Sequence, residues 1–517
     1  MTTPMQSIRF YHRGHVVDVA GVHPTRTVLD WLREDAQRTG TKEGCNEGDC
    51  GACTVVIAEL AEPGAADAVG GLRLQTVNAC IQFLPTLHGK ALFTVEDLKA
   101  MSGADGPAKG ALHPVQQAMV DCHGSQCGFC TPGFVMSMWS CYEQHQQHGT
   151  RPSRQQLADE LSGNLCRCTG YRPILDAGQR MFDLPAVRLD TGPVVQALQG
   201  LRRQTTFDYA APLGQRIDHF HAPTTVAELA ALCEAKPQAR LLAGSTDIGL
   251  WVNKQFRDLG DIIYLGDVAE LKRIEERKIA RGRELYIGAG ASLEDAWRAL
   301  ATRFEGLTDV WLRFASPPIR HAGTMGGNVA NGSPIGDSAP VLMALDAQVE
   351  LRRGANARRL ALPEFYVDYM KNRLEPGEFV QGLAVPLAVR RRRVRAYKIS
   401  KRFDCDISAV CGGFSLALDG DKVEEIRLAF GGMAAIVKRA ATAEAALVGK
   451  PWDQASALRA QAALADDFSP LTDMRASADY RLRVAQNLIQ RFWLETRPAD
   501  ALPTEATSVW SAMPHEV

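Results

Sequence analysis

The chain has 517 residues, of which 58 are basic and 59 acidic, so its formal net charge is −1. A chain of this length is too long to fold around one ordinary hydrophobic core, and it predicts three or four domains. A balanced charge gives no indication of nucleic acid or an anionic membrane as a partner, and neither is expected. The first residues, MTTPMQSIRFYHRG, lack the apolar core of a signal peptide, and the sequence has no apolar run long enough to span a bilayer. We therefore expect a soluble, cytoplasmic protein.

Cysteine is concentrated in the first third of the chain. Ten of the thirteen cysteines precede residue 170, and only Cys233, Cys405 and Cys411 follow it. A reducing compartment gives no reason to expect a disulfide framework. Cysteines gathered in one third of such a chain predict metal binding.

Residues 1–92 contain the first cysteine pattern. IRFYHRGHVVDV alternates around a turn and predicts a hairpin, and TRTVLDWLRED has the apolar spacing of a helix. KEGCNEGDCGACTVV then places Cys45, Cys50 and Cys53 with four and two residues between them, and Cys80 follows in TVNACIQF. This spacing is typical of a plant-type 2Fe–2S cluster, in which four thiolates hold two irons. A ferredoxin-like β-grasp domain is predicted, and a zinc site or reduced core cysteines are the alternatives.

Glycines accompany these cysteines. Gly44, Gly48 and Gly51 permit positive φ, so that backbone amides can turn inward and donate to cluster sulfurs. A glycine-rich loop of this kind has little purpose in a hydrophobic core, and it favours the cluster over the alternatives.

Residues 93–185 contain the second pattern. HGSQCGFCTPGFV supplies Cys127 and Cys130, and GNLCRCTGYRP supplies Cys166 and Cys168, which only Arg167 separates. Zinc sites usually space paired cysteines by two to four residues, and a disulfide between such close neighbours would be strained. The apolar run 134–142 and the N-cap Ser153 predict two helices that bring the pairs together near helix ends. A structural zinc site is the alternative, and the remaining Cys122 and Cys141 are predicted to be buried thiols.

CxxC followed by CxC, after a plant-type pattern, resembles the iron–sulfur region of the molybdenum hydroxylases, the xanthine oxidase family. In that family an all-helical second domain carries its own 2Fe–2S centre. The resemblance implies that Cys127, Cys130, Cys166 and Cys168 are its ligands. A binuclear cluster has two irons, so a closely spaced pair can bind it without wrapping one tetrahedral ion.

Two further segments are rich in turn residues. Residues 186–218 lack sustained periodicity and predict a surface linker. HAPTTVAELAALCEAKPQARLLAGSTDIGLWV then predicts a capped helix, a strand, and a Gly-Ser-Thr turn that opens a second helix. Its amides and hydroxyls suit a pyrophosphate, although a plain strand-to-helix connection would look alike. RHAGTMGGNVANGSPIGDSAP adds Gly323, Gly326, Gly327, Asn328, Gly332 and Gly336, and close approach of the main chain to a large anionic ligand would account for them.

Both segments resemble the FAD-binding domain of the same family, which has no Rossmann fingerprint. The resemblance implies an FAD domain over residues 219–388, with Phe314 beside the isoalloxazine and Asp337 as a hydrogen-bonding acid. A core position is the alternative for Phe314. The implied FAD contacts are Leu242, Ala243, Gly244, Ser245, Thr246, Asp247, Ile248, Phe314, Thr324, Met325, Gly326, Gly327, Asn328, Asp337, Val380 and Lys398.

Residues 389–517 resemble the C-terminal domain of the family's flavoproteins. The run VRRRRVRAYK predicts a solvated edge strand in preference to an anion site. GGFSLALDGDKVEEIRLAFGGM predicts a hairpin that turns at Asp419-Gly420, and SADYRLRVAQNLIQRFWLET predicts a helix. The fold class expected for the whole chain is multidomain α+β: a β-grasp ferredoxin domain, an all-α 2Fe–2S domain, a two-part FAD-binding domain and an α+β flavoprotein domain.

The domain content implies electron transfer. It resembles the small subunit of bacterial xanthine dehydrogenases, in which a partner large subunit holds the molybdenum cofactor, and an α2β2 heterotetramer is expected. Electrons from purine hydroxylation would then pass through two 2Fe–2S clusters and FAD to NAD⁺. No residue of this chain is expected to act on the purine, but Asp404 and Asp406, on either side of Cys405, are expected to tune the NAD⁺ step. A related subunit for another N-heterocycle or an aldehyde is the alternative, and a metal scaffold or redox sensor is a third possibility.

Overall fold

The computed structural model describes residues 6–101, 111–280, 282–387 and 392–507. The chain divides into two compact units. The first contains Met1–Glu270 and Ala315–Thr324, and the second contains Leu271–Phe314 and Met325–Val517. The chain therefore passes from the first unit to the second, returns for ten residues, and leaves again. Among the described residues, no helix combines the length and the apolar character needed to cross a membrane.

A six-stranded sheet opens the first unit. Its order is β2-β1-β6-β3-β5-β4, with β1 parallel to β6 and the other neighbours antiparallel. The strands are β1 (Ile8–His12), β2 (His15–Val19), β3 (Thr54–Leu60), β4 (Ala68–Val69), β5 (Leu72–Asn78) and β6 (Ala91–Phe93). The predicted hairpin is confirmed, and it turns at Arg13 and Gly14, both with positive φ. The predicted helix is also present, as α1 (Val28–Asp30) continued by a π-helical turn (Trp31–Asp35).

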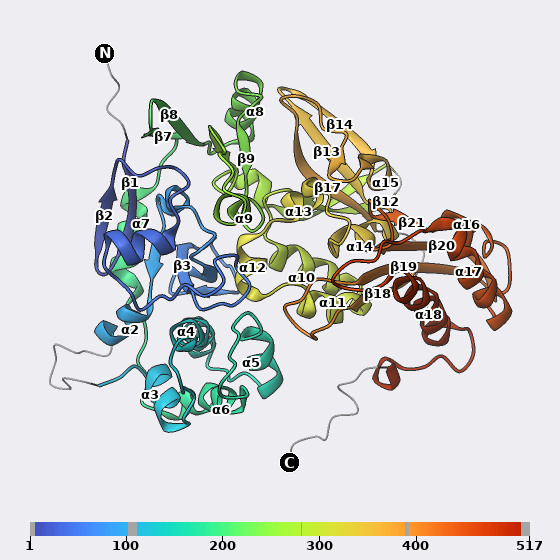
Figure 1. Ribbon diagram of the computed structural model, residues 1–517, viewed down its shortest axis with the longest axis horizontal. Coiled ribbons are helices and arrows are strands. Elements are labelled where there is room, and N and C mark those ends of the chain that lie inside the picture. Colours follow the sequence, from blue (N-terminus) through green and yellow to red (C-terminus); the bar gives the residue numbers. More distant parts are fainter. Residues whose placement is uncertain (1–5, 102–110, 281, 388–391, 508–517) are drawn as a thin grey trace. The chain divides into compact units, whose positions relative to one another are not determined.

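The next part of the first unit is helical in its described residues. Its helices are α2 (Val95–Met101), α3 (Pro114–Asp121), α4 (Thr131–His148), α5 (Arg154–Glu160) and α6 (Arg172–Arg180). Figure 1 shows α3, α4, α5 and α6 gathered into one group. Trp139, Tyr142 and Leu157 are fully buried in its core. Ser153 is the N-cap of α5, as predicted, and completes a capping box with Gln156.

The segment predicted as an irregular linker contains regular structure, so that part of the prediction is wrong. Helix α7 (Thr191–Leu201) and strand β7 (Phe207–Leu213) lie within it. Val194, Leu198 and Leu201 are buried on one face of α7. Their helical spacing is interrupted by glycine, glutamine and alanine, which hid the pattern, and the helix gains stability from packing rather than from propensity.

A second sheet of the first unit has the order β7-β8-β10-β9. It adds β8 (Arg216–Ala222), β9 (Arg240–Leu242) and β10 (Ile262–Tyr264), with helices α8 (Val226–Ala235) and α9 (Ile248–Asn253). The predicted capped helix, strand and second helix are therefore confirmed. Helix α12 (Pro317–Ala322) returns to this unit and contacts β5, where His321 Nδ1 lies 3.1 Å from the carbonyl oxygen of Thr76.

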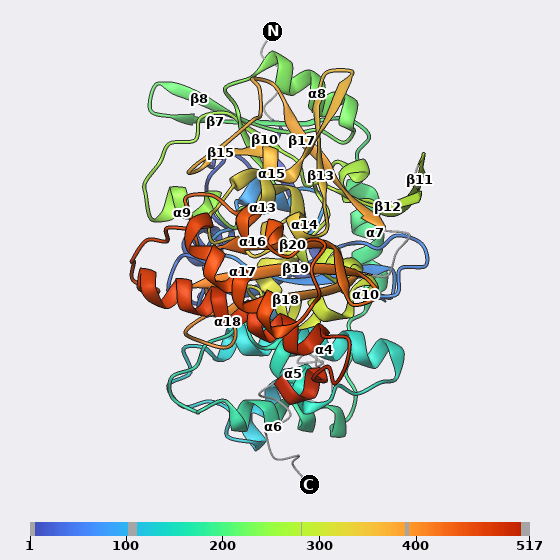
Figure 2. The ribbon, with the colours of Figure 1, turned by 90° about the vertical axis from the view of Figure 1, so that its right-hand side faces the viewer.

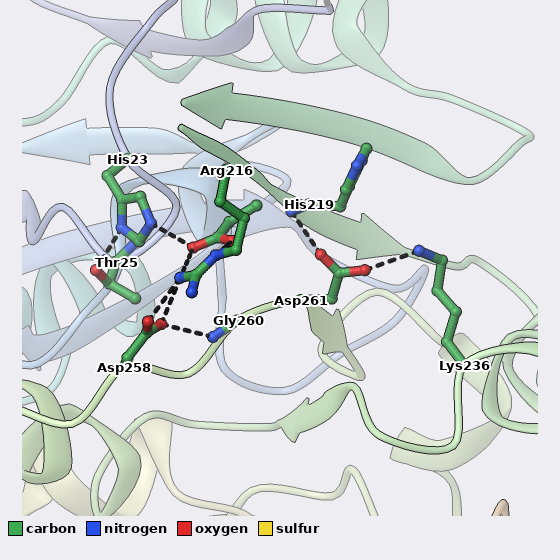
Figure 3. A network of polar contacts seen from close by, with 9 residues as sticks. His23, Thr25, Arg216, His219, Lys236, Asp258, Gly260 and Asp261 are labelled. Carbon is green, nitrogen blue, oxygen red and sulfur yellow. Dashed lines mark hydrogen bonds and ion pairs between the residues drawn. The ribbon is translucent and has the colours of Figure 1, made fainter. Parts of the chain in front are cut away.

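A polar network ties the segment after β2 to the second sheet (Figure 3). His23 Nε2 lies 2.9 Å from Asp218 Oδ2, and Arg216 bonds both Asp218 and Asp258. Beside it, Asp261 accepts from the backbone amide of His219 and from Lys236 Nζ. Asp218 is 1% exposed, so the network has a buried centre and a solvated edge.

The second unit begins with an antiparallel sheet of order β11-β12-β17-β13-β14. Its strands are β11 (Ile274–Ile279), β12 (Gly282–Gly288), β13 (Gln348–Arg353), β14 (Asn356–Ala361) and β17 (Phe379–Leu387). A small pair, β15 (Tyr366–Asp368) and β16 (Lys371–Asn372), lies apart. The helices are α10 (Leu293–Arg303), α11 (Thr308–Arg313), α13 (Met325–Asn331), α14 (Ser338–Ala344) and α15 (Leu362–Phe365).

A four-stranded sheet, β18-β19-β20-β21, completes the second unit. Its strands are β18 (Arg393–Ile399), β19 (Val410–Asp419), β20 (Lys422–Gly431) and β21 (Lys438–Arg439). Figure 2 shows α16 (Ala441–Ala445) and α18 (Ala478–Thr496) against this sheet, and α17 (Gln454–Asp467) packs against both of these helices. Short 3-10 turns occur at Leu84–Leu87, Met181–Asp183, Ala269–Lys272, Glu305–Leu307 and Thr504–Thr507.

Most predictions for this last part are confirmed. The hairpin turns with Asp419 opposite Lys422 and Gly420 at φ 62°, and α18 is the predicted helix. Strand β18 is an edge strand, as expected for the arginine run, but it is not a solvated one, because Val394, Ala396, Tyr397 and Lys398 are buried. Residues 389–391 of that run lie outside the described residues.

Candidate functional site

The first four cysteines meet at the end of the six-stranded sheet. Cys45 and Cys50 lie in the loop before β3, Cys53 directly precedes that strand, and Cys80 follows β5. The side chains of Cys45 and Cys50 interact, as do those of Cys45 and Cys80 and those of Cys53 and Cys80. The fold therefore brings the predicted set together, with Cys53 and Cys80 almost fully buried.

Backbone amides point at these sulfurs. The amide of Cys50 donates to Cys45 Sγ at 3.4 Å, the amide of Glu47 donates to the same sulfur, and that of Ala52 donates to Cys50. The pKa of the Cys45 thiol is held well below its ordinary value, chiefly by hydrogen bonds from Cys50 and Cys80. The same contacts raise the pKa of those two partners. Crowded thiols with inward amides suit a cationic iron core whose sulfurs accept hydrogen bonds.

The glycine prediction holds in two of its three positions. Gly48 and Gly51 have φ of 79° and 69°, as expected for a loop that turns its amides inward. Gly44 is needed for space, because an added Cβ would lie 2.7 Å from Cys50 Sγ. Asn46 adopts the left-handed conformation instead, with φ 56°, and asparagine is a residue type that tolerates it.

The second four cysteines meet among the helices. Cys130 is the N-cap of α4, and Cys166 and Cys168 lie between α5 and α6, so each pair lies near a helix end as predicted. The side chain of Cys127 interacts with that of Cys168, and that of Cys130 with that of Cys166. Burial raises the pKa of the Cys130 thiol to about 12. The outer cysteines, Cys127 and Cys168, are exposed to solvent.

The surroundings of Cys166 supply polar partners that the sequence reasoning missed. Thr169 Oγ1 donates to Cys166 Sγ at 3.2 Å, and the amide of Cys166 donates to the Tyr171 hydroxyl at 3.1 Å. Both residues lie in TGYRP, directly after the cysteine pair, and that position was the only signal available. Of the two cysteines outside the pattern, Cys141 is buried as predicted, whereas Cys122 is only partly buried at the end of α3.

Both sets fit an iron–sulfur cluster by the chemistry of their donors. Each gathers four sulfurs, and each has amide or hydroxyl donors directed at a sulfur. Within the described residues, no group of three or more His, Cys, Asp or Glu side chains is arranged to hold a single metal ion.

The predicted FAD turn, Leu242 to Ile248, joins β9 to α9 in the first unit. Gly244 is packed against the chain, because an added Cβ would lie 1.8 Å from the carbonyl oxygen of Ala322. Ser245 has φ 61°, and its buried hydroxyl has no hydrogen-bond partner among the described residues. A buried hydroxyl of this kind is what a bound ligand would satisfy. Burial raises the pKa of the neighbouring Asp247.

The second predicted FAD segment, Thr324 to Asn328, includes the start of α13. The amides of Met325 and Gly326 donate to the carbonyl oxygens of Ala291 and Ala289 at 3.0 Å. An added Cβ at Gly326 would lie 2.3 Å from Ala289 Cβ, so packing within the second unit explains this glycine without a ligand.

Asp337 and Lys398 form a buried pair in the second unit. Lys398 Nζ lies 2.7 Å from Asp337 Oδ2 and 2.7 Å from Ser408 Oγ, which in turn donates to Asp337 Oδ1 at 2.6 Å. The adjacent Ser338 hydroxyl is buried and has no partner among the described residues, so it also fits a ligand.

The other predicted contacts occupy the second unit as well. Phe314 ends α11 and packs against Trp297, with ring centroids 5.8 Å apart. Val380 lies in β17, almost buried, opposite Leu351. These positions suit a hydrophobic core, and an FAD role for either residue stays a prediction.

The loop of Asp404 and Asp406 follows β18. Asp406 accepts from the backbone amides of Arg402 at 2.8 Å and Ile407 at 3.0 Å, so it shapes the loop. Cys405 is buried with φ 49°, an uncommon conformation for a residue other than glycine. Arg313 anchors the loop from α11 by donating to the carbonyl oxygens of Lys398 and Phe403.

Four family models match the chain in succession. They are the 2Fe–2S iron–sulfur cluster binding domain over residues 11–83, the 2Fe–2S binding domain over 94–179, the FAD binding domain in molybdopterin dehydrogenase over 215–388, and the CO dehydrogenase flavoprotein C-terminal domain over 395–496. A xanthine dehydrogenase from Emericella nidulans is 31% identical over 96% of this chain and 39% of its own length. The chain belongs to the molybdenum hydroxylase family.

An aldehyde oxidase and a CO dehydrogenase are also similar to the chain. An aldehyde oxidase 2 from Macaca fascicularis is 28% identical over 94% of this chain and 39% of its own length. A reconstituted CO dehydrogenase from Oligotropha carboxidovorans has 25% identity, a TM-score of 0.50, and covers 54% of this chain and 97% of its own. The chain spans about two fifths of the length of the curated relatives it matches.

The matches confirm several predictions. The multidomain α+β class is confirmed, with two iron–sulfur domains, an FAD domain and a flavoprotein C-terminal domain. The chain therefore contains the domains that bind 2Fe–2S clusters and FAD in this family. Its substrate and electron acceptor are not fixed by these relatives, which include both xanthine dehydrogenases and an aldehyde oxidase.

Proposed function

We propose that this chain is the electron-transfer subunit of a purine-hydroxylating dehydrogenase. The observation that carries the proposal is the presence of two complete four-cysteine sets and an FAD-binding domain on one chain, together with similarity to xanthine dehydrogenases over 96% of its length. When bound, the clusters accept electrons singly and FAD accepts them in pairs. The protein supplies the ligands, the amide donors and the burial that hold these groups.

The residues proposed to bind the clusters and FAD are those implied by the resemblance to the molybdenum hydroxylase family. Cys45, Cys50, Cys53 and Cys80 would bind one cluster, and Cys127, Cys130, Cys166 and Cys168 the other. The partnerless hydroxyls of Ser245 and Ser338 support ligand contacts at the predicted FAD segments of each unit. The domain limits 1–92, 93–185, 219–388 and 389–517 remain part of the proposal.

The proposal extends to partners and acceptor. A separate large subunit would hold the molybdenum cofactor and hydroxylate the purine, in an α2β2 assembly, and NAD⁺ would take the electrons from FAD. A cytoplasmic location fits the use of NAD⁺ and reduced cysteines. Similarity to an aldehyde oxidase favours a second candidate, the equivalent subunit for an aldehyde or another N-heterocycle.

The test is to purify the chain from its own cells with whatever polypeptides accompany it. We expect a large molybdenum-containing subunit, and reduction of NAD⁺ by hypoxanthine and xanthine. Aldehydes and other N-heterocycles are assayed in parallel, and activity confined to them would replace the purine proposal. Reduction of an artificial dye but not of NAD⁺ would overturn the proposal that NAD⁺ is the electron acceptor. About four irons and four labile sulfides per chain are expected, and a zinc-rich preparation without labile sulfide would overturn the ligand assignment.

A further inference from the structure

One buried side chain connects the two cysteine loops. Asn164 is 2% exposed, and its Nδ2 donates to the carbonyl oxygen of Gly51 at 3.0 Å and to Thr54 Oγ1 at 3.1 Å. Its Oδ1 accepts from Ser137 Oγ at 2.6 Å. Gly51 lies in the loop of the first set and Thr54 begins β3 directly after Cys53, whereas Ser137 lies on α4, which begins directly after Cys130. One side-chain amide thus joins its own segment, which carries Cys166, to two other segments that carry predicted cluster ligands.

The neighbouring residue makes the link a continuous path. The amide of Leu165 donates to the carbonyl oxygen of Cys50 at 3.0 Å. Cys50 belongs to the first set, and Leu165 directly precedes Cys166 of the second. The two ligand sets are therefore connected by backbone bonds and a single hydrogen bond.

Close packing fixes the spacing where Asn164 connects the Gly51 loop to α4, a contact that we call the joint. An added Cβ at Gly51 would lie 2.2 Å from the carbonyl oxygen of Gly163, and one at Gly133 would lie 2.1 Å from the carbonyl oxygen of Gly51. Backbone therefore meets backbone on both sides of Asn164, and the joint has no room for another side chain. Hydrogen-bonded groups in such a place keep one register, because any slip leaves buried polar groups unpaired.

We propose that Asn164 is a positioning residue that holds the two cysteine sets in register and keeps the Leu165–Cys50 hydrogen bond formed, so that electronic coupling between the two clusters depends on it. The inference rests on the two clusters alone and not on the purine or NAD⁺ of the proposed function. When reduced, each cluster has an unpaired spin, and nearby spins split each other's paramagnetic resonance lines. That splitting reports the joint directly.

The test uses the full chain with both clusters bound and reduced by dithionite. Asn164→Asp keeps the shape of the side chain, but its carboxylate cannot donate to the Gly51 carbonyl or to Thr54. We expect both cluster signals to be retained with the wild-type spin count, and the splitting between them to be lost or narrowed. Asn78→Ala is the control, because Asn78 is equally buried and its Nδ2 lies 3.9 Å from Cys53 Sγ in the first set. It should shift the first signal and leave the splitting unchanged.

Ser137→Ala is the milder variant, and it tests whether the splitting depends on Asn164 if Asn164→Asp does not fold. It removes one hydrogen bond to Asn164 and leaves both of its donors in place, so we expect a partial narrowing of the splitting. Wild-type splitting in every folded variant with both clusters bound would overturn the proposal. Loss of a whole cluster signal in Asn164→Asp, together with wild-type splitting in Ser137→Ala, would also overturn it, since Asn164 would then only support a ligand loop. Because dithionite replaces the substrate, failure of the purine or NAD⁺ assignment would leave these results unaffected.

Discussion

Lys398 Nζ and Asp337 Oδ2 form an ion pair 2.7 Å apart, and both side chains are buried. Ser408 bonds each partner, which leaves neither charge without a polar neighbour. Removing one partner of a buried pair costs about 3–5 kcal/mol, because the other charge is left uncompensated, whereas neutralising both is often tolerated.

We therefore expect Lys398→Met to lower the melting temperature of the chain markedly, and Lys398→Met with Asp337→Asn to recover most of the loss. Thermal unfolding of the full chain with FAD content measured in parallel checks this. A double variant that is stable but lacks FAD would support the predicted flavin contact of this pair. Equal stability of the single and double variants would contradict the pairing argument.

Glu143 on α4 gives a pH dependence of stability. Its side chain is fully buried; Oε1 accepts from Trp139 Nε1 and from the amide of Leu189, and Oε2 has no partner among the described residues. Burial raises its pKa to about 7. Because the folded pKa lies above the unfolded one, the folded state holds the proton more tightly. Its stabilisation is complete at acid pH, declines from about pH 4.5 to 7, and is lost above.

The expected loss across that window is on the order of 3 kcal/mol. Glu143→Gln should flatten it and be more stable than wild type at pH 8, whereas the exposed Glu34→Gln should follow the wild-type curve. Denaturant unfolding between pH 4.5 and 8 provides the measurement. A wild-type slope in Glu143→Gln would show that other groups control this range.

Asp218 is expected to act in the opposite direction. Hydrogen bonds from Arg216, and then from His23, hold the pKa of this carboxylate below its ordinary value. Its stabilisation is therefore present above pH 4 and is lost as the pH falls through the lowered pKa. Asp218→Asn should cost about 1–3 kcal/mol at pH 7, and this cost should decrease progressively as the pH falls below about 4. The solvent-exposed Asp258→Asn, which also loses a bond to Arg216, serves as the control in the same melts and should cost far less. Equal losses of unfolding free energy in the two variants would contradict the prediction, because the buried Asp218 would then contribute no more than the exposed Asp258.

Cys168→Ser should damage one cluster only. The two ligand sets lie in separate domain matches, and Cys168 interacts with Cys127 rather than with the first set. Paramagnetic resonance of the reduced variant should lack one of two signals. Cys122→Ser is the matched control, since that residue belongs to neither set. Retention of both signals in Cys168→Ser would remove this residue from the ligands.

Asp406→Asn should slow NAD⁺ reduction in the assembled enzyme several-fold, while FAD content and dye reduction remain near wild type. This prediction rests on the proposed function. A carboxylate near a flavin ring opposes negative charge on that ring by Coulomb repulsion and so favours hydride departure. Asp406 also accepts two backbone amides, so Asp404→Asn is compared as a charge change at the neighbouring acid of the same loop. Equal loss of NAD⁺ and dye activity would indicate a disordered loop instead.

The sequence predicted those parts of the site in which chemistry constrains the spacing. Cysteine intervals identified the two sets of four cysteines that the fold brings together, and the cap at Ser153 located a helix between the two pairs of the second set. Local patterns also found the hairpin at Gly420 and the long helix α18.

What the sequence did not show depends on contacts between distant segments. Asn164 is an ordinary polar residue in sequence, and its role appears only where α4 and the loop of Gly51 pack around it. Gly44 was assigned a conformational role, but the thiol of Cys50, which occupies its side-chain space, explains it instead. Helix α7 was missed because its buried residues are few and its stability comes from tertiary packing.

The return of Ala315–Thr324 to the first unit sets an order of events during synthesis. His321 contacts Thr76, a residue made 245 positions earlier, and at a common elongation rate of about 5–20 residues per second that gap lasts roughly 12–50 seconds. Until α9 is made, the carbonyl oxygen of Cys80 lacks its donor, the side-chain amide of Asn253. Until α12 is made, the loop of Gly48 lacks its neighbour Ile319. The region of the first four cysteines thus lacks these contacts while residues 81–322 are being made, which leaves a period in which iron and sulfide can enter before the later chain packs against it.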